Sequence, residues 1–222
     1  AGLPLLLVLG TLSFWLREAG IDRTTIGYLS WVGLAYAFKW VWSPLLDQWR
    51  LPLLGKLGRR RSWLVLSQSL VILGLIGMGF CDPQKHLSWL IAIAVVVSFA
   101  SATQDIAVDA YRLEIAEDNR QAALAASYMS GYRVAALLAT AGALFFAEGF
   151  GSTGFNYKHS AWTGTYVLFG ALIQGGFDLS LEKPNIPTET FIFIQGLIIL
   201  FCGAMENFYA PAISALLKRT KG

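Results

Sequence analysis

Charged residues in this chain gather in a few short clusters, and the stretches between the clusters are almost wholly apolar. The stretches 26–46, 62–80 and 122–147 show this most clearly. A helix needs roughly 20 mostly apolar residues to cross the hydrocarbon core of a bilayer, so these stretches have the length of membrane spans. The spacing of the charges therefore predicts a polytopic α-helical membrane protein.

Composition supports this prediction and excludes several functional classes. Of 222 residues, 55% are hydrophobic and only 14% are charged, whereas a soluble domain carries about 25% charged residues. The net charge of +3 is modest, so we expect no nucleic-acid partner. Two cysteines, Cys81 and Cys202, make neither a disulfide framework nor a metal site. No metalloprotease, hydrolase or phosphate-loop motif occurs, and we expect no enzyme activity, no cofactor and no metal.

The pattern predicts an all-α domain over residues 1–173. Its six spans are expected at 3–16, 26–46, 62–80, 87–111, 122–147 and 161–173. The first span opens inside apolar sequence and lacks the basic start of a signal peptide, so we expect a helix that has lost its beginning. Residues 174–222 are expected to form a polar linker and one further apolar helix. Glu206 and Asn207 interrupt that helix, and its assignment stays open.

Lysine and arginine fall unevenly on the loops between these spans. The second and fourth loops carry seven, namely Arg50, Lys56, Arg59, Arg60, Arg61, Arg112 and Arg120. The first, third and fifth loops carry four, namely Arg17, Arg23, Lys85 and Lys158. Because cytoplasmic loops are enriched in Lys and Arg, the second and fourth loops are predicted to face the cytoplasm. A basic tail at Lys218 would oppose this bias if 190–217 spans the membrane.

The fourth span carries a polar stripe. Ser98, Ser101, Asp105, Asp109 and Arg112 follow helical spacing and share one face. A carboxylate facing lipid is costly, so this face is predicted to line the bundle interior or a wet cavity. Asp105 is our main candidate for substrate binding or proton transfer. Asp109 and Arg112 lie nearer the end of the span, where they can instead cap or anchor the helix.

Two cations also lie within predicted spans. Lys39 stands eight residues before Asp47, about 12 Å from the helix end at the usual rise. It either snorkels to the membrane surface or faces the interior, where Asp105 is its natural partner. Arg133, beside Tyr132, lies near the middle of the fifth span. It either contacts substrate or pairs with Asp105 or Asp109.

Three segments together resemble a known family. They are 35–47 (Ala-Tyr-Ala-Phe-Lys-Trp-Val-Trp-Ser-Pro-Leu-Leu-Asp), 58–64 (Gly-Arg-Arg-Arg-Ser-Trp-Leu) and 101–110 (Ser-Ala-Thr-Gln-Asp-Ile-Ala-Val-Asp-Ala). Asp47 followed by Gly58 and the arginines 59–61 resembles the loop signature of the major facilitator superfamily, with a longer insert. Over residues 1–173 the chain resembles the N-terminal six-helix half of the bacterial muropeptide permease (AmpG) family.

That resemblance implies a multi-pass protein of the bacterial inner membrane that imports anhydromuropeptides for peptidoglycan recycling. It further implies coupling to protons, an indirect effect on β-lactamase induction, and functional roles for Gln104 and Asp105. The expected partners are a sugar–peptide substrate, protons, membrane lipid, and a C-terminal half or second copy that completes the pathway. Asp47, Arg59, Arg60 and Arg61 are the expected gating residues of the cytoplasmic loop.

Two alternatives stay open. A facilitator for acetyl-CoA has a similar Gln-Asp-Ile-Ala-Val-Asp run, although CoA phosphates call for more cavity cations than the spans supply. A membrane-embedded enzyme or scaffold is the second alternative. The mixed-charge loop 112–121 is its only candidate site, and that loop is typical of a solvated turn.

Overall fold

The computed structural model describes residues 2–49, 58–115, 121–154 and 156–181. Within this part of the chain the regular structure is helical, apart from an isolated bridge between Thr153 and Asn156. The prediction of an all-α architecture is confirmed. Glu206 and Asn207, like the rest of 182–222, lie outside the described residues, so the tail assignment stays a prediction.

The helices follow the predicted spans in order. The first segment consists of α1 (Gly2–Leu6), the π-helical η1 (Leu7–Thr11) and α2 (Leu12–Glu18). The second consists of α3 (Arg23–Leu29), the 3-10 turn η2 (Ser30–Gly33), α4 (Leu34–Ala37) and α5 (Lys39–Gln48). Next come α6 (Arg59–Phe80) and α7 (Pro83–Ile115). The last described elements are α8 (Gln121–Leu137), π-helical η4 (Leu138–Gly142), α9 (Ala143–Gly149) and α10 (His159–Leu181).

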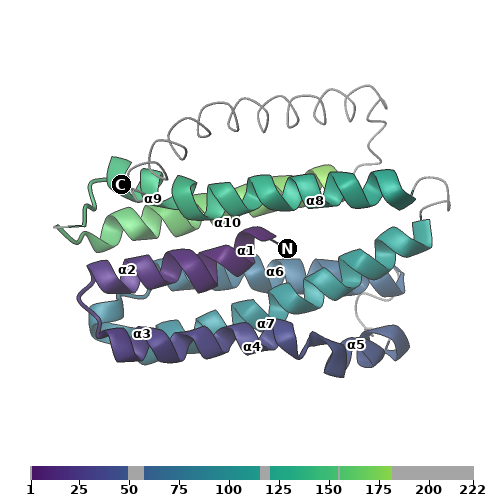
Figure 1. The fold of residues 1–222 in the computed structure, drawn as a ribbon, viewed down its shortest axis with the longest axis horizontal. Coiled ribbons are helices and arrows are strands. Elements are labelled where there is room, and N and C mark those ends of the chain that lie inside the picture. Colours follow the sequence, from purple (N-terminus) through teal and green to yellow (C-terminus); the bar gives the residue numbers. More distant parts are fainter. Residues whose placement is uncertain (1, 50–57, 116–120, 155, 182–222) are drawn as a thin grey trace, which may run out of the picture.

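Three helices in the described ranges are long and apolar enough to cross a membrane. They cover Arg60–Phe80, Pro83–Tyr111 and Tyr128–Gly149. The segments run side by side along the length of the molecule, which gives an elongated bundle (Figure 1). Length, composition and packing together make this part of the chain a polytopic membrane bundle.

The two predicted sets of loops lie at opposite ends of the bundle (Figure 1). At one end the hydroxyl of Ser152 donates to Glu18, and Tyr157 donates to Asp82 across 3.2 Å. These contacts join the first, third and fifth turns. At the other end Arg60 bridges the second and fourth turns through Asp47 and Glu114. The alternation of ends expected from the sequence is therefore present, and the compartment at each end stays a prediction.

The core is densely packed where α6 meets α7 and α10. Trp15, Trp162, Tyr166 and Phe169 are fully buried, and Trp15 stacks on Trp162 with 5.6 Å between ring centroids. At Gly79 a Cβ atom would lie 3.3 Å from the backbone oxygen of Thr163. Small residues allow such close approach between helices in membranes.

One boundary differs from the sequence prediction. We expected the sixth span to end near residue 173 and a polar linker to begin at 174. Instead α10 continues to Leu181, while the division of the chain into two parts at 174 stays a prediction. Polar residues alone do not stop a helix, and the first proline after this span is Pro184.

Candidate functional site

Asp105 lies inside the bundle and is bonded from two other helical segments. Its Oδ2 atom is 2.6 Å from the ammonium nitrogen of Lys39 on α5. Its Oδ1 atom accepts a hydrogen bond of 2.8 Å from the hydroxyl of Tyr128 on α8. Only 15% of the Asp105 side chain is exposed. The carboxylate on α7 thus connects three helical segments, and both of its oxygens are engaged.

A break in the second segment brings Lys39 to this position. Phe38 leaves the helical conformation at φ −95° and ψ 7°, so α4 ends before it and α5 begins after it. Lys39 is the first residue of α5, and 36% of its side chain is exposed. Of the two possibilities left open by the sequence, snorkelling and pairing with Asp105, the structure contains the pair.

The polar stripe on α7 faces inward as predicted. Ser98 and Ser101 are buried, and Asp109 is half-buried one turn beyond Asp105. Ser101 accepts a hydrogen bond of 2.5 Å from the hydroxyl of Tyr36 on α4. The stripe therefore packs against α4 and α5. Arg112 lies on α7 as well, but its side chain is outside the described atoms.

Gln104 points to a different part of the bundle from its neighbour Asp105. Its amide nitrogen donates to Oε1 of Gln68 on α6. The amide nitrogen of Gln68 in turn donates to the backbone oxygen of Ile173 on α10, at 3.2 Å. Adjacent residues of α7 thus bind two separate sets of helices.

Tyr132 and Arg133 are not part of the Asp105 cluster. The Tyr132 ring lies against Gly2 of α1, where an added Cβ would come within 2.7 Å of it. The Arg133 side chain is exposed, and no hydrogen bond or ion pair joins it to another described residue. The alternative in which Arg133 pairs with Asp105 is therefore not what the structure shows, because Lys39 and Tyr128 already bind both oxygens.

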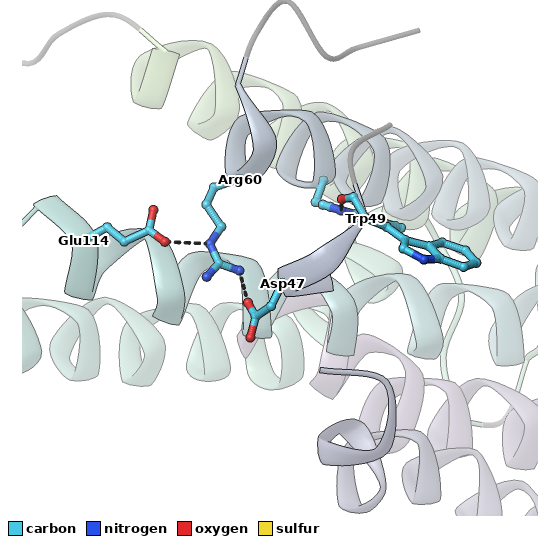
Figure 2. Close-up of polar contacts among 5 residues, drawn as sticks. Asp47, Trp49, Arg60 and Glu114 are labelled. Atoms are coloured by element: carbon cyan, nitrogen blue, oxygen red, sulfur yellow. Dashed lines mark hydrogen bonds and ion pairs between the residues drawn. The ribbon is translucent and has the colours of Figure 1, made fainter. Parts of the chain in front are cut away.

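The basic loop signature also forms a defined cluster, drawn in Figure 2. The guanidinium of Arg60 donates to Asp47 through Nη1 and to Glu114 through Nε, the latter at 2.9 Å. Arg60 is 13% exposed, whereas about half of each carboxylate side chain is exposed, at 52% and 49%. The cluster therefore fastens the ends of α5, α6 and α7 together.

Arg59 and Arg61 lie beside Arg60 on α6, at the same end of the bundle. Arg61 donates to the hydroxyl of Tyr111 at 3.3 Å, and its guanidinium carbon lies 6.0 Å from the centre of that ring. Trp63 donates to the backbone oxygen of Trp49 at 3.1 Å, and Trp49 lies close to the Arg60 cluster (Figure 2). Arg59 begins α6, and its side chain is outside the described atoms.

Four partners in these clusters were not predicted from the sequence. They are Tyr128, Gln68, Tyr36 and Glu114. For Gln68 a signal was present, because an amide side chain inside an apolar span needs a hydrogen-bonding partner. The hydroxyls of Tyr36 and Tyr128 gave no such signal, since tyrosine is also common at membrane interfaces.

Comparison with known proteins identifies similar sequences. The family described as "Acetyl-coenzyme A transporter 1" matches residues 1–87. The anhydromuropeptide permease of Escherichia coli K12 is 40% identical over 190 residues, which is 86% of this chain and 36% of the relative. The putative transporter AmpG 4 of Rickettsia felis is 38% identical over 222 residues, which is 96% of this chain and 51% of the relative.

A further relative, the putative transporter AmpG 3 of Rickettsia typhi, is 31% identical over 193 residues and is covered to 44% of its length. The chain therefore spans between about a third and a half of the length of these relatives. The similarity covers both segments that carry the Asp105 cluster and the Arg60 cluster. Over most of its length the chain is therefore similar to an anhydromuropeptide permease and to putative AmpG transporters, and its all-α architecture with helices long enough to span a membrane agrees with this similarity.

Proposed function

We propose that this chain is part of an inner-membrane permease that imports anhydromuropeptides. The observation that carries the proposal is the Lys39–Asp105–Tyr128 cluster. In it the ionisable carboxylate of Asp105 lies on α7, a helix long and apolar enough to span a membrane. Such groups are costly in the membrane and are typically retained for transport or proton relay. The similarity to a relative named anhydromuropeptide permease supports the proposed substrate class.

Asp105 is proposed as the coupling residue. In its charged form it binds Lys39 at 2.6 Å and accepts from Tyr128. Protonation removes its negative charge and weakens the attraction to Lys39, so the contacts among three helical segments become dependent on proton binding. Proton-coupled import from the periplasm would supply peptidoglycan recycling. The resulting cytosolic fragments would influence β-lactamase induction.

Arg133, Tyr132 and Asp109 are proposed to line the substrate path. Arg133 is exposed and has no partner in the described part of the chain, which leaves its guanidinium available for an anionic group of the peptide. Tyr132 lies beside it on α8, and Asp109 lies on the inward face of α7. A complete path requires a C-terminal half or a second copy, because transporters of this kind bind substrate between two repeats.

We also propose that the Arg60 cluster is a gate at the cytoplasmic end. Arg60 holds the ends of three helices together through the carboxylates of Asp47 and Glu114. Arg59 and Arg61 are its neighbours on α6. Relative movement of α5 and α7 has to break at least one of these contacts. The cluster is therefore suited to favour one conformation of that end.

Uptake of radiolabelled anhydromuropeptide by the native full-length protein tests the proposal. We expect Asp105→Asn to reduce uptake by at least tenfold, with normal amounts of protein in the membrane. The matched control is Glu148→Gln, because Glu148 is exposed at the opposite end of the bundle. Undiminished uptake by Asp105→Asn would remove this residue from the coupling mechanism, and no uptake by the unaltered protein would refute the substrate.

A second candidate is an acetyl-CoA facilitator, which the family match over residues 1–87 favours. That match contains Lys39 but ends before Gln104 and Asp105. Competition separates the two candidates. Excess unlabelled CoA should leave muropeptide uptake unchanged if the first proposal is right, whereas direct uptake of labelled acetyl-CoA would support the second.

A further inference from the structure

A second chain of hydrogen bonds joins α7 to α6 and α10. It begins at the backbone oxygen of Ile173 on α10, passes through the side-chain amide of Gln68 on α6, and ends at the amide of Gln104 on α7. Gln68 is only 5% exposed. We refer to these three groups as the amide relay.

The relay has a defined direction. A backbone carbonyl can only accept, so Gln68 must turn its nitrogen toward Ile173. Its oxygen then faces Gln104, and Gln104 must present its own nitrogen in return. The two ends of a glutamine amide look alike by shape, and the hydrogen-bond network decides which is which. Here the assignment of all three groups follows from one carbonyl.

Because the nitrogen of the Gln104 amide donates to Gln68, the remaining hydrogen-bonding group of this side chain is its oxygen. Its Oε1 atom is buried, and it has no hydrogen-bond donor among the described residues. A buried acceptor without a donor is unfavourable, so this oxygen is suited to receive an N–H or O–H group. It cannot bond favourably to a phosphate or carboxylate oxygen, because both partners would be acceptors.

We propose that Gln68 is a positioning residue that orients the Gln104 amide, so that Gln104 acts toward substrate as a hydrogen-bond acceptor. The ligand groups it takes are neutral donors, such as the N–H of an acetamido group or a sugar hydroxyl. This inference rests on the proposed transport function and deepens it, because it assigns part of the substrate specificity to a residue that need not touch the substrate.

A double-mutant cycle on thermal unfolding in detergent tests the relay itself. The variants are Gln68→Leu, Gln104→Leu and the two combined, with Ser67→Ala as the matched control. Ser67 is equally buried on α6, but within the described part of the chain its hydroxyl bonds only to the backbone oxygens of Trp63 and Leu64 on the same helix. We expect the combined variant to lose no more stability than the single variant with the smaller loss. Strictly additive losses of stability would overturn the relay.

Uptake kinetics test the positioning role. In the native full-length protein we expect Gln68→Leu to raise the KM for labelled anhydromuropeptide about fivefold to tenfold, the effect of losing one oriented hydrogen bond, with kcat within twofold. Gln68→Glu should restore the KM, because a buried, protonated carboxyl can donate to Ile173 and accept from Gln104. A residue that only stabilised the fold would lower the amount of active protein and leave KM unchanged. That result, or failure of the glutamate to restore KM, would overturn the proposal.

The two experiments also separate the inference from the function on which it rests. If the unaltered protein takes up no anhydromuropeptide, the proposed function fails, while the unfolding cycle still decides whether the relay exists. If uptake is normal and KM is insensitive to Gln68→Leu, the positioning role alone fails.

Discussion

The ammonium of Lys39 on α5 lies 2.6 Å from Oδ2 of Asp105 on α7. Lys39 is the first residue after the break at Phe38, so a short helical interruption places the cation opposite the acid. The Tyr128 hydroxyl holds the second carboxylate oxygen. Asp105 therefore has one contact with a cation and one with a neutral hydroxyl.

Removing Lys39 should destabilise the protein more than removing both charges. Lys39→Ala leaves a largely buried carboxylate with only Tyr128, and we expect a loss of about 1–3 kcal/mol. This lies below the 3–5 kcal/mol of a fully buried pair because part of Lys39 is exposed. Adding Asp105→Asn should recover stability, as measured by thermal unfolding in detergent. Lys85→Ala, at an exposed lysine 3.9 Å from Asp82, is the control. Equal losses in the single and double variants would argue against the charge pair.

Replacing Arg60 by lysine should not preserve the cluster at the end of the bundle. The guanidinium contacts Asp47 and Glu114 through different nitrogens, and an ammonium cannot reproduce this planar arrangement. Because both carboxylates are half-exposed, we expect a modest loss of about 1 kcal/mol or less for Arg60→Lys. The measurement is thermal unfolding at low and high salt, with Arg17→Lys at the opposite end as control. A loss that is the same for both variants would mean that the cluster contributes nothing specific.

Enlarging Gly74 should disturb the contact between α6 and α7. A Cβ at this position would come within 2.3 Å of a methyl group of Val97, and valine has little rotamer freedom in a helix. We expect Gly74→Ala to cost about 1–3 kcal/mol in unfolding experiments. The control is Gly131→Ala, where nothing lies within 4 Å of an added Cβ. Combining Gly74→Ala with Val97→Ala should recover part of the loss, and no recovery would place the strain elsewhere.

Tyr157 should make the stability fall at high pH. It lies in the turn before α10, and burial raises its pKa to about 12. In the unfolded chain the hydroxyl of Tyr157 ionises at about pH 10. Folding therefore favours its neutral form, and the stability from this residue is lost as pH rises between about 10 and 12. Unfolding followed from pH 8 to 12 should show a steeper decline in the unaltered protein than in Tyr157→Phe. If stability declines in parallel with pH in the two proteins, Tyr157 is not the source of the loss of stability.

Much of the architecture was predictable because hydropathy and helical spacing are local properties. The apolar stretches located the helices, and the spacing of Ser98, Ser101 and Asp105 located the inward face of α7. Helix ends were less predictable, since a polar residue is compatible with a helix. For this reason α10 runs beyond the expected boundary to Leu181.

The candidate site was predictable in part. Its ionisable members stood out because charge is rare in a membrane span, and Asp105 and Lys39 were identified on that ground. Their uncharged partners Tyr128 and Gln68 did not stand out. A tyrosine or glutamine acquires a role only when another helix brings a partner within hydrogen-bonding distance, and sequence spacing says nothing about distances between helices.

The sequence by itself therefore determined that this chain is helical and membrane-spanning and that Asp105 needs a partner, because the cost of exposing a charge to lipid is independent of the details of packing. It offered both Lys39 and Arg133 as that partner. Only the tertiary structure decided between them, since the break at Phe38 and the packing of α5 on α7 set which cation reaches the carboxylate. Arg133 is exposed on α8, and its contact with substrate stays a proposal.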